Sequence, residues 1–140
     1  MSRWKQQRGL LAVIPALGLL SACGANPTQP TTTEGVTVYQ HPNYGGESHM
    51  FIRDHNNLDD LRGPCLAADA STAGSSWYSC VSSIQVAEGW EAVLFERDDF
   101  AGQSLSVTSD ITDLEDQGGP PSCGGHWDDC ILSIQVFQTN

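Results

Sequence analysis

Basic residues are scarce in this chain of 140 residues, which has six Lys and Arg against 17 Asp and Glu. Three of the six, Arg3, Lys5 and Arg8, lie at the N-terminus. Without residues 1–22 the chain keeps three arginines, so its formal charge falls to about −14. A surface this acidic argues against nucleic acid or an anionic lipid surface as the partner.

Long apolar runs are also rare, and the clearest one, over residues 10–20, follows the N-terminal basic residues. It is shorter than a bilayer-spanning helix and has the length of a signal-peptide core. It ends in Leu-Ser-Ala-Cys, which resembles the lipobox of bacterial lipoproteins. The resemblance implies a signal peptide over 1–22, lipidation of Cys23, and an exported protein anchored by lipid in the cell membrane or outer membrane. A plain secretory signal with an incidental cysteine is the alternative.

No C-x-x-C pair is present, which excludes zinc-ribbon and thioredoxin-like sites. With Cys23 lipidated, an even number of cysteines remains in an oxidising compartment, and this predicts two disulfides. Three pairings are open among Cys65, Cys80, Cys123 and Cys130.

Common active-site patterns are missing as well. The chain has no H-E-x-x-H motif, no G-x-S-x-G elbow and no Gly-rich phosphate loop between a strand and a helix. Acidic residues at 110–116 have counterparts at 54–60, so we interpret both groups as a turn of an internal repeat and not as acid–base pairs. We expect no catalytic residues and no enzymatic activity.

A Pro/Thr-rich segment over residues 24–35 has no apolar pattern, and we expect a disordered linker there after the lipidated Cys23. The predicted domain covers 36–140. It contains two copies of one motif, at about 36–87 and 91–138.

The repeat is visible in two blocks. Residues 38–51 and 94–107 share an aromatic-x4-aromatic-x-Gly pattern at an offset of 56. Residues 77–86 (WYSCVSSIQV) and 127–136 (WDDCILSIQV) match at an offset of 50. The six-residue difference falls in the loop between the blocks, where an insertion costs little.

Each copy is predicted to be a four-strand β unit. Runs of β-branched and aromatic residues precede turn clusters, and apolar residues then alternate with polar ones, with no sustained period of 3.6. Gly46 and Gly102 are expected at positive φ in the turns. Two such units predict a β-sandwich. The expected core aromatics are Trp77, Trp90 and Trp127.

These motifs resemble the Greek-key motif of the βγ-crystallins, in which an aromatic hairpin is followed by a strand ending Ser-Ile-x-Val. The resemblance covers about residues 36–137. It implies an all-β fold in which two Greek-key motifs form one βγ-crystallin-like sandwich. It also implies a binding or structural module, which we expect to be monomeric; the sequence identifies no protein partner.

Calcium-binding members of that family carry Asn/Asp-Asn/Asp-x-x-Ser/Thr-Ser at the last strand of each motif. Residues 78–83 (YSCVSS) keep the serines and lack the acids, whereas residues 128–133 (DDCILS) keep the acids and lack the first serine. The resemblance therefore implies one weak Ca²⁺ site and one lost site. The alternative is a metal-free domain whose acids are solvated turn residues.

The implied Ca²⁺ site joins the Asp129 carboxylate to the Ser82 hydroxyl. Asp128 and a backbone carbonyl near Cys80 are its further candidate ligands. The complementary site would contain Ser79 and Leu132, and a leucine side chain supplies no oxygen.

Equivalent positions in the repeat favour the pairs Cys65–Cys80 and Cys123–Cys130, with a Cys80–Cys130 bridge between the copies as the alternative. A second function is also open. Small secreted metalloproteinase inhibitors of microbes are similar in fold and carry two disulfides, and the long loop over Arg62–Ser76 is a candidate inhibitory loop.

Overall fold

The computed structural model describes residues 31–66 and 75–139. Its elements are strands and two short 3-10 helices. In chain order they are β1 (Val36–His41), η1 (Pro42–Tyr44), β2 (Gly45–Phe51), β3 (Arg62–Leu66), β4 (Ser75–Ser76), β5 (Ser83–Val86), β6 (Trp90–Phe95), β7 (Ser104–Val107), η2 (Pro121–Cys123) and β8 (Ser133–Gln138). No helix in this part of the chain is long and apolar enough to cross a membrane.

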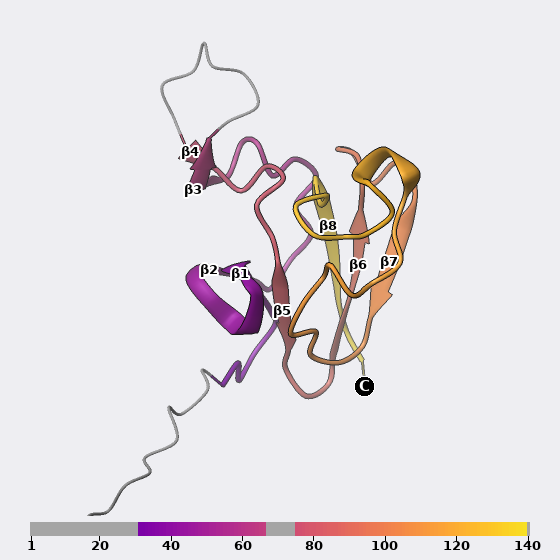
Figure 1. Cartoon of the computed structure of the whole chain (residues 1–140). Coiled ribbons are helices and arrows are strands. Elements are labelled where there is room, and N and C mark those ends of the chain that lie inside the picture. Colours follow the sequence, from indigo (N-terminus) through magenta and orange to yellow (C-terminus); the bar gives the residue numbers. More distant parts are fainter. Residues whose placement is uncertain (1–30, 67–74, 140) are drawn as a thin grey trace, which may run out of the picture.

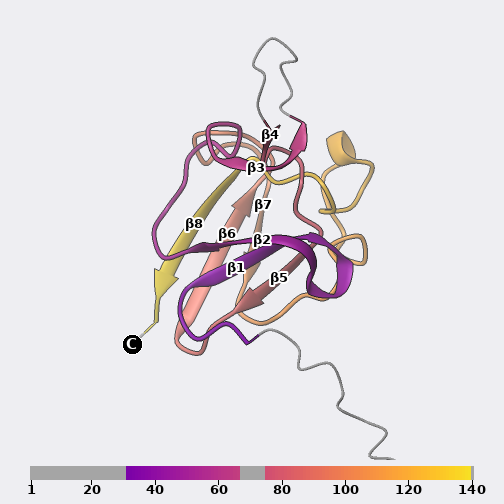
Figure 2. The same cartoon turned by 90° about the vertical axis from the view of Figure 1, so that its left-hand side faces the viewer.

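Two antiparallel sheets of three strands form the body of the domain, and β3 and β4 form a small separate sheet (Figure 1). The strand orders are β2-β1-β5 and β7-β6-β8, so each copy of the repeat builds its own sheet in the same arrangement. Figure 2 shows the two sheets stacked on each other with their strands crossing. The all-β Greek-key prediction is confirmed.

The fourth strand expected in each copy is reduced to a single β-bridge, which it forms with the sheet of the other copy. His55, in the first copy, forms a single β-bridge with Ile134 of β8, and Ile111, in the second copy, forms one with Ile84 of β5. This exchange ties the two sheets together through backbone hydrogen bonds in both directions, 2.8–2.9 Å long.

Alternating side chains from both sheets fill one core. The largest fully buried side chains include Trp77, Leu58, Ile84, Leu94, Leu114, Ile131 and Ile134. Trp127 is also buried. Trp90 corrects the prediction of three core tryptophans, because it only packs against this core and stays partly exposed. It is the first residue of β6, directly after the turn that joins β5 to β6.

Both repeat glycines have the predicted backbone conformation, with φ of +76° at Gly46 and +80° at Gly102. A Cβ atom at Gly102 would lie 2.6 Å from Cγ of Glu96. Glycine therefore satisfies both the left-handed backbone and the close contact in the second hairpin.

A buried serine at the start of each last strand holds the hairpin of its own copy. The Ser133 hydroxyl donates to the carbonyl of Arg97 (2.5 Å) and accepts from the backbone N–H of Phe100 (3.1 Å). Ser83 makes the same two bonds in the first copy. This explains why a Ser-Ile-x-Val strand and an aromatic hairpin occur together in each copy of the repeat.

We expect Ser133→Ala to lower the free energy of unfolding by about 1–3 kcal/mol, because it leaves a backbone donor and a backbone acceptor without their partner. Urea unfolding at constant m-value measures the loss. Exposed Ser104 is the matched control, and Ser104→Ala should change stability by less than about 0.5 kcal/mol. Equal losses for the two variants would contradict the assignment.

The end of the predicted linker lies against the first sheet. The Thr32 hydroxyl is 3.0 Å from Oγ1 of Thr37 and 3.4 Å from Oε1 of Gln85, two neighbouring residues on β1 and β5. The backbone N–H of Ala87 donates to the carbonyl of Gly35. Contact with the domain therefore begins before Val36. The predicted signal peptide, the predicted lipidation site Cys23 and the first part of the predicted linker lie outside the described residues.

Candidate functional site

The structure joins the cysteines in the pairing that the repeat favoured. The Cα atoms of Cys65 and Cys80 are 5.8 Å apart, and those of Cys123 and Cys130 are 5.7 Å apart. The Cys80–Cys130 alternative is therefore wrong. Cys80 is buried and its sulfur is bonded to Cys65, so its backbone carbonyl is the atom that it can offer to a cation.

A hydrogen bond between the two copies brings the segment of Asp129 beside that of Ser82. The backbone N–H of Asp129 donates to the carbonyl of Val81 at 3.1 Å. Ser82 is buried, and its own N–H donates to the carbonyl of Tyr39 at 2.9 Å. The carboxylate and hydroxyl that were predicted to share a site thus come from neighbouring segments with fixed backbones.

Asp129 carries a poorly compensated negative charge. Partial burial, followed by repulsion from Asp128, raises the pKa of Asp129 to about 6, and His126 and His41 oppose this shift only in part. One oxygen of Asp128, Oδ1, is buried and has no hydrogen-bond partner in the described part of the chain. Two adjacent carboxylates in this state favour a bound cation.

An open cavity of about 290 Å³ lies at the complementary position. Ser79 and Leu132, the pair expected at the lost site, both line it, together with Asp128 and Asp129. The apolar Leu132 side chain replaces a possible oxygen ligand there. The two acids therefore line this cavity, whereas Ser82 is not part of its lining.

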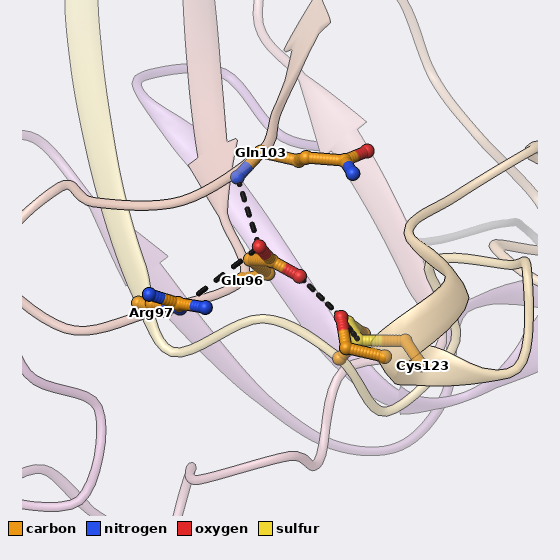
Figure 3. The surroundings of a disulfide bond; sticks show 6 residues. Glu96, Arg97, Gln103 and Cys123 are labelled. Carbon is orange, nitrogen blue, oxygen red and sulfur yellow. Dashed lines mark hydrogen bonds and ion pairs between the residues drawn. A yellow bond between two sulfur atoms is a disulfide. The ribbon is translucent and has the colours of Figure 1, made fainter.

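Glu96 forms another wall of the cavity, and sequence reasoning missed it. Its carboxylate accepts hydrogen bonds from the Gln103 backbone (3.1 Å) and the Ser122 hydroxyl (2.5 Å), which lower the pKa of Glu96. Figure 3 shows this carboxylate between Gln103 and the segment of Cys123. Glu96 therefore braces the second hairpin against the disulfide segment. The sequence offered one sign of this role, since a residue with a side-chain acceptor, Gln40, holds the equivalent position.

The donor set suits calcium better than zinc. In residues 31–66 and 75–139 no three His, Cys, Asp or Glu side chains gather closely enough to hold a metal ion. A cation at Asp129 would therefore have to complete its shell with hydroxyl, carbonyl and water oxygens. Calcium accepts such ligands, whereas structural zinc prefers four sulfur and nitrogen ligands.

The acids that we excluded as catalytic pairs have structural partners. The Asp54 carboxylate accepts a hydrogen bond from the backbone N–H of Val136 (2.9 Å), and Asp110 accepts one from that of Val86 (2.8 Å). Each bond links one copy of the repeat to the last strand of the other. This supports their interpretation as a fixed turn of the motif.

Comparison with known proteins gives structural neighbours alone. No family model matches the sequence, and no curated protein matches it significantly. Among solved structures, a βγ-crystallin domain from Flavobacterium johnsoniae is 28% identical, with a TM-score of 0.53 over 75% of this chain and 96% of that one. A βγ-crystallin domain from Clostridium beijerinckii is 24% identical, with a TM-score of 0.53 over 76% of this chain and 100% of that one.

A third neighbour, solved in connection with the evolution of the eye-lens βγ-crystallin domain fold, is 22% identical and has a TM-score of 0.58. It is matched over 79% of this chain and 93% of its own length. The described domain therefore has the βγ-crystallin fold, with two Greek-key motifs in one sandwich.

Proposed function

We propose that this chain is an exported, lipid-anchored, non-enzymatic βγ-crystallin-like module whose domain binds one Ca²⁺ ion weakly and is stabilised by it. The observation that carries the calcium proposal is the bond from Asp129 to Val81, which holds the acidic segment of the second copy beside Ser82 of the first. The raised pKa of Asp129 and the unpartnered oxygen of Asp128 support it.

Calcium would act on this domain by mass action. An ion that binds only the folded state raises stability by RT ln(1 + [Ca²⁺]/Kd), about 2.7 kcal/mol at a hundredfold excess over Kd. With one acidic ligand segment we expect a Kd of about 10⁻⁴ to 10⁻³ M, the range of extracellular modules. Such a site stabilises a domain in a calcium-rich medium and does not sense cytosolic signals.

The test is a calorimetric titration of the oxidised chain from residue 24 to 140 after chelator treatment, with thermal melts alongside. We expect one weak site and a melting temperature that rises with calcium. Asp129→Asn should abolish both effects. Asp116→Asn, which removes the same charge from an exposed turn, should leave them intact. Absence of heat and of any shift would refute the proposal and favour a protein-binding role that uses the Arg62–Ser76 loop.

Proton competition gives the same site a second signature. Since the folded-state pKa of Asp129 is about 6, calcium affinity should fall as the pH drops through 6. Without calcium, the stability of the fold changes with pH in the opposite direction. A raised folded-state pKa stabilises the fold fully below the unfolded value of 3.8, and this contribution disappears as the pH rises through about 6. Asp129→Asn should remove this segment of the stability profile.

A further inference from the structure

A second open cavity, of about 690 Å³, lies where the turn between the two copies meets the loop after β7. Trp90 forms an aromatic part of its wall. The lining residues with polar side chains are Glu88, Glu91, Asp110, Thr108, Ser109 and Thr139. None of the three arginines of the described residues belongs to this lining, so the three acidic residues of the cavity wall have no cationic side chain beside them there.

The turn that carries Trp90 has a fixed backbone. The N–H of Trp90 donates to the carbonyl of Ala87 (3.1 Å), and the N–H of Thr139 donates to the carbonyl of Gly89 (2.7 Å). Gly89 has a φ of +78°, which a side chain would strain. The aromatic wall is therefore held in place before any ligand arrives, which reduces the entropy cost of binding.

Trp90 also differs from the two tryptophans that the fold requires. Trp77 and Trp127 occupy equivalent positions in the two copies, and both are 2% exposed. The position equivalent to Trp90, at the offset of 56, is Glu34. The repeat therefore does not require a tryptophan at this position. The Trp90 side chain stays partly exposed beside acids that make no ion pair among the described residues.

We propose that this cavity, the Trp90 groove, binds a small organic ammonium ion. An ammonium group over an indole face is attracted by the ring quadrupole, and a nearby carboxylate adds Coulomb attraction. Glu88 and Glu91 make no ion pair among the described residues and are free to contribute it. The ligand class is an ammonium group with an apolar surface, either quaternary or at the end of an alkyl stem. This inference is independent of the calcium site.

The test titrates the oxidised chain from residue 24 to 140 with choline in the presence of a chelator, which keeps the calcium site out of the measurement. Trp90 is the most accessible tryptophan of the described residues, and Trp4 lies outside the titrated fragment, so a change in tryptophan fluorescence reports on the groove. We expect a saturable change at about millimolar choline and about tenfold weaker binding of 3,3-dimethylbutanol, its neutral analogue. A parallel titration with Nα-acetyl-lysine amide distinguishes a stem-borne primary ammonium from a quaternary one.

Three variants distinguish binding in the groove from a general effect of the protein's negative charge. Binding to Trp90→Leu, which lacks the fluorescent side chain, is measured by calorimetry. Glu88→Gln should weaken choline binding several-fold, and Trp90→Leu should abolish it. Glu115→Gln removes the same charge from an exposed turn outside the groove and should change nothing. Equal binding of the neutral analogue, tighter binding of N-acetylglucosamine, or unchanged affinity in Glu88→Gln would overturn the proposal. Because Glu88 is exposed, that variant stays informative even if Trp90→Leu fails to fold.

Discussion

Trp77→Ala is expected to lower the free energy of unfolding by about 3–5 kcal/mol, the range for removal of a buried aromatic side chain. Trp77 is 2% exposed, and its ring packs against the backbone of Gly63, where an added Cβ would lie 2.5 Å from the indole. The centroid of the His49 ring, on β2, lies 6.4 Å from the centroid of the Trp77 ring. Since elements on several sides meet this ring, its loss leaves a cavity that the backbone cannot easily fill.

Denaturant unfolding of the oxidised chain measures this loss, and Trp90→Ala is the comparison. The same truncation at Trp90 removes a side chain that is already partly exposed, so we expect less than half of the cost. Similar losses at the two positions would mean that Trp90 belongs to the core after all. That result would also weaken the case for the Trp90 groove.

The internal repeat made the fold predictable. Two blocks with different offsets identified two equivalent units, and equivalence alone selected the pairs Cys65–Cys80 and Cys123–Cys130. The hairpin glycines could be predicted because positive φ is a local backbone property. These predictions depended on residues close in sequence or related by the repeat, so one sequence was sufficient.

Features that depend on contacts between residues far apart in the sequence could not be predicted in the same way. Trp90 and Trp77 look alike in the sequence, and only the packed sandwich shows that Trp77 is buried and Trp90 is partly exposed. Glu96 looked like an ordinary surface acid, yet its partner Ser122 lies 26 residues further along the chain. The shortened fourth strand of each copy escaped prediction because a single β-bridge leaves almost no alternating pattern.

The residues of the candidate calcium site could be predicted from the sequence, but their arrangement in space could not. The residue types at Asp129 and Ser82 came from the family resemblance, whereas their proximity follows from one backbone bond between the copies. The repulsion between Asp128 and Asp129 could be expected from adjacency alone. The buried, unpartnered oxygen of Asp128 could not, because its burial depends on how the whole domain packs.

Removal of the Cys65–Cys80 bridge by a double serine substitution is the second large effect, and we expect it to cost about 3 kcal/mol. The bridge closes a loop with a sequence separation of 15, and the chain-entropy model assigns about 3 kcal/mol to a loop of that length. The Cys123–Cys130 bridge closes a loop with a separation of 7, for which the same model gives about 2 kcal/mol.

Thermal and urea unfolding of the two double variants, with and without calcium, separate the roles of the bridges. Loss of Cys65–Cys80 should have the larger cost without calcium, because its loop is longer. Loss of Cys123–Cys130 should have the larger effect on calcium stabilisation, because Cys130 directly follows Asp129 and its release loosens the acidic segment. If calcium stabilises both variants equally, the second bridge does not position Asp129, and the bond to Val81 holds the acid in place on its own.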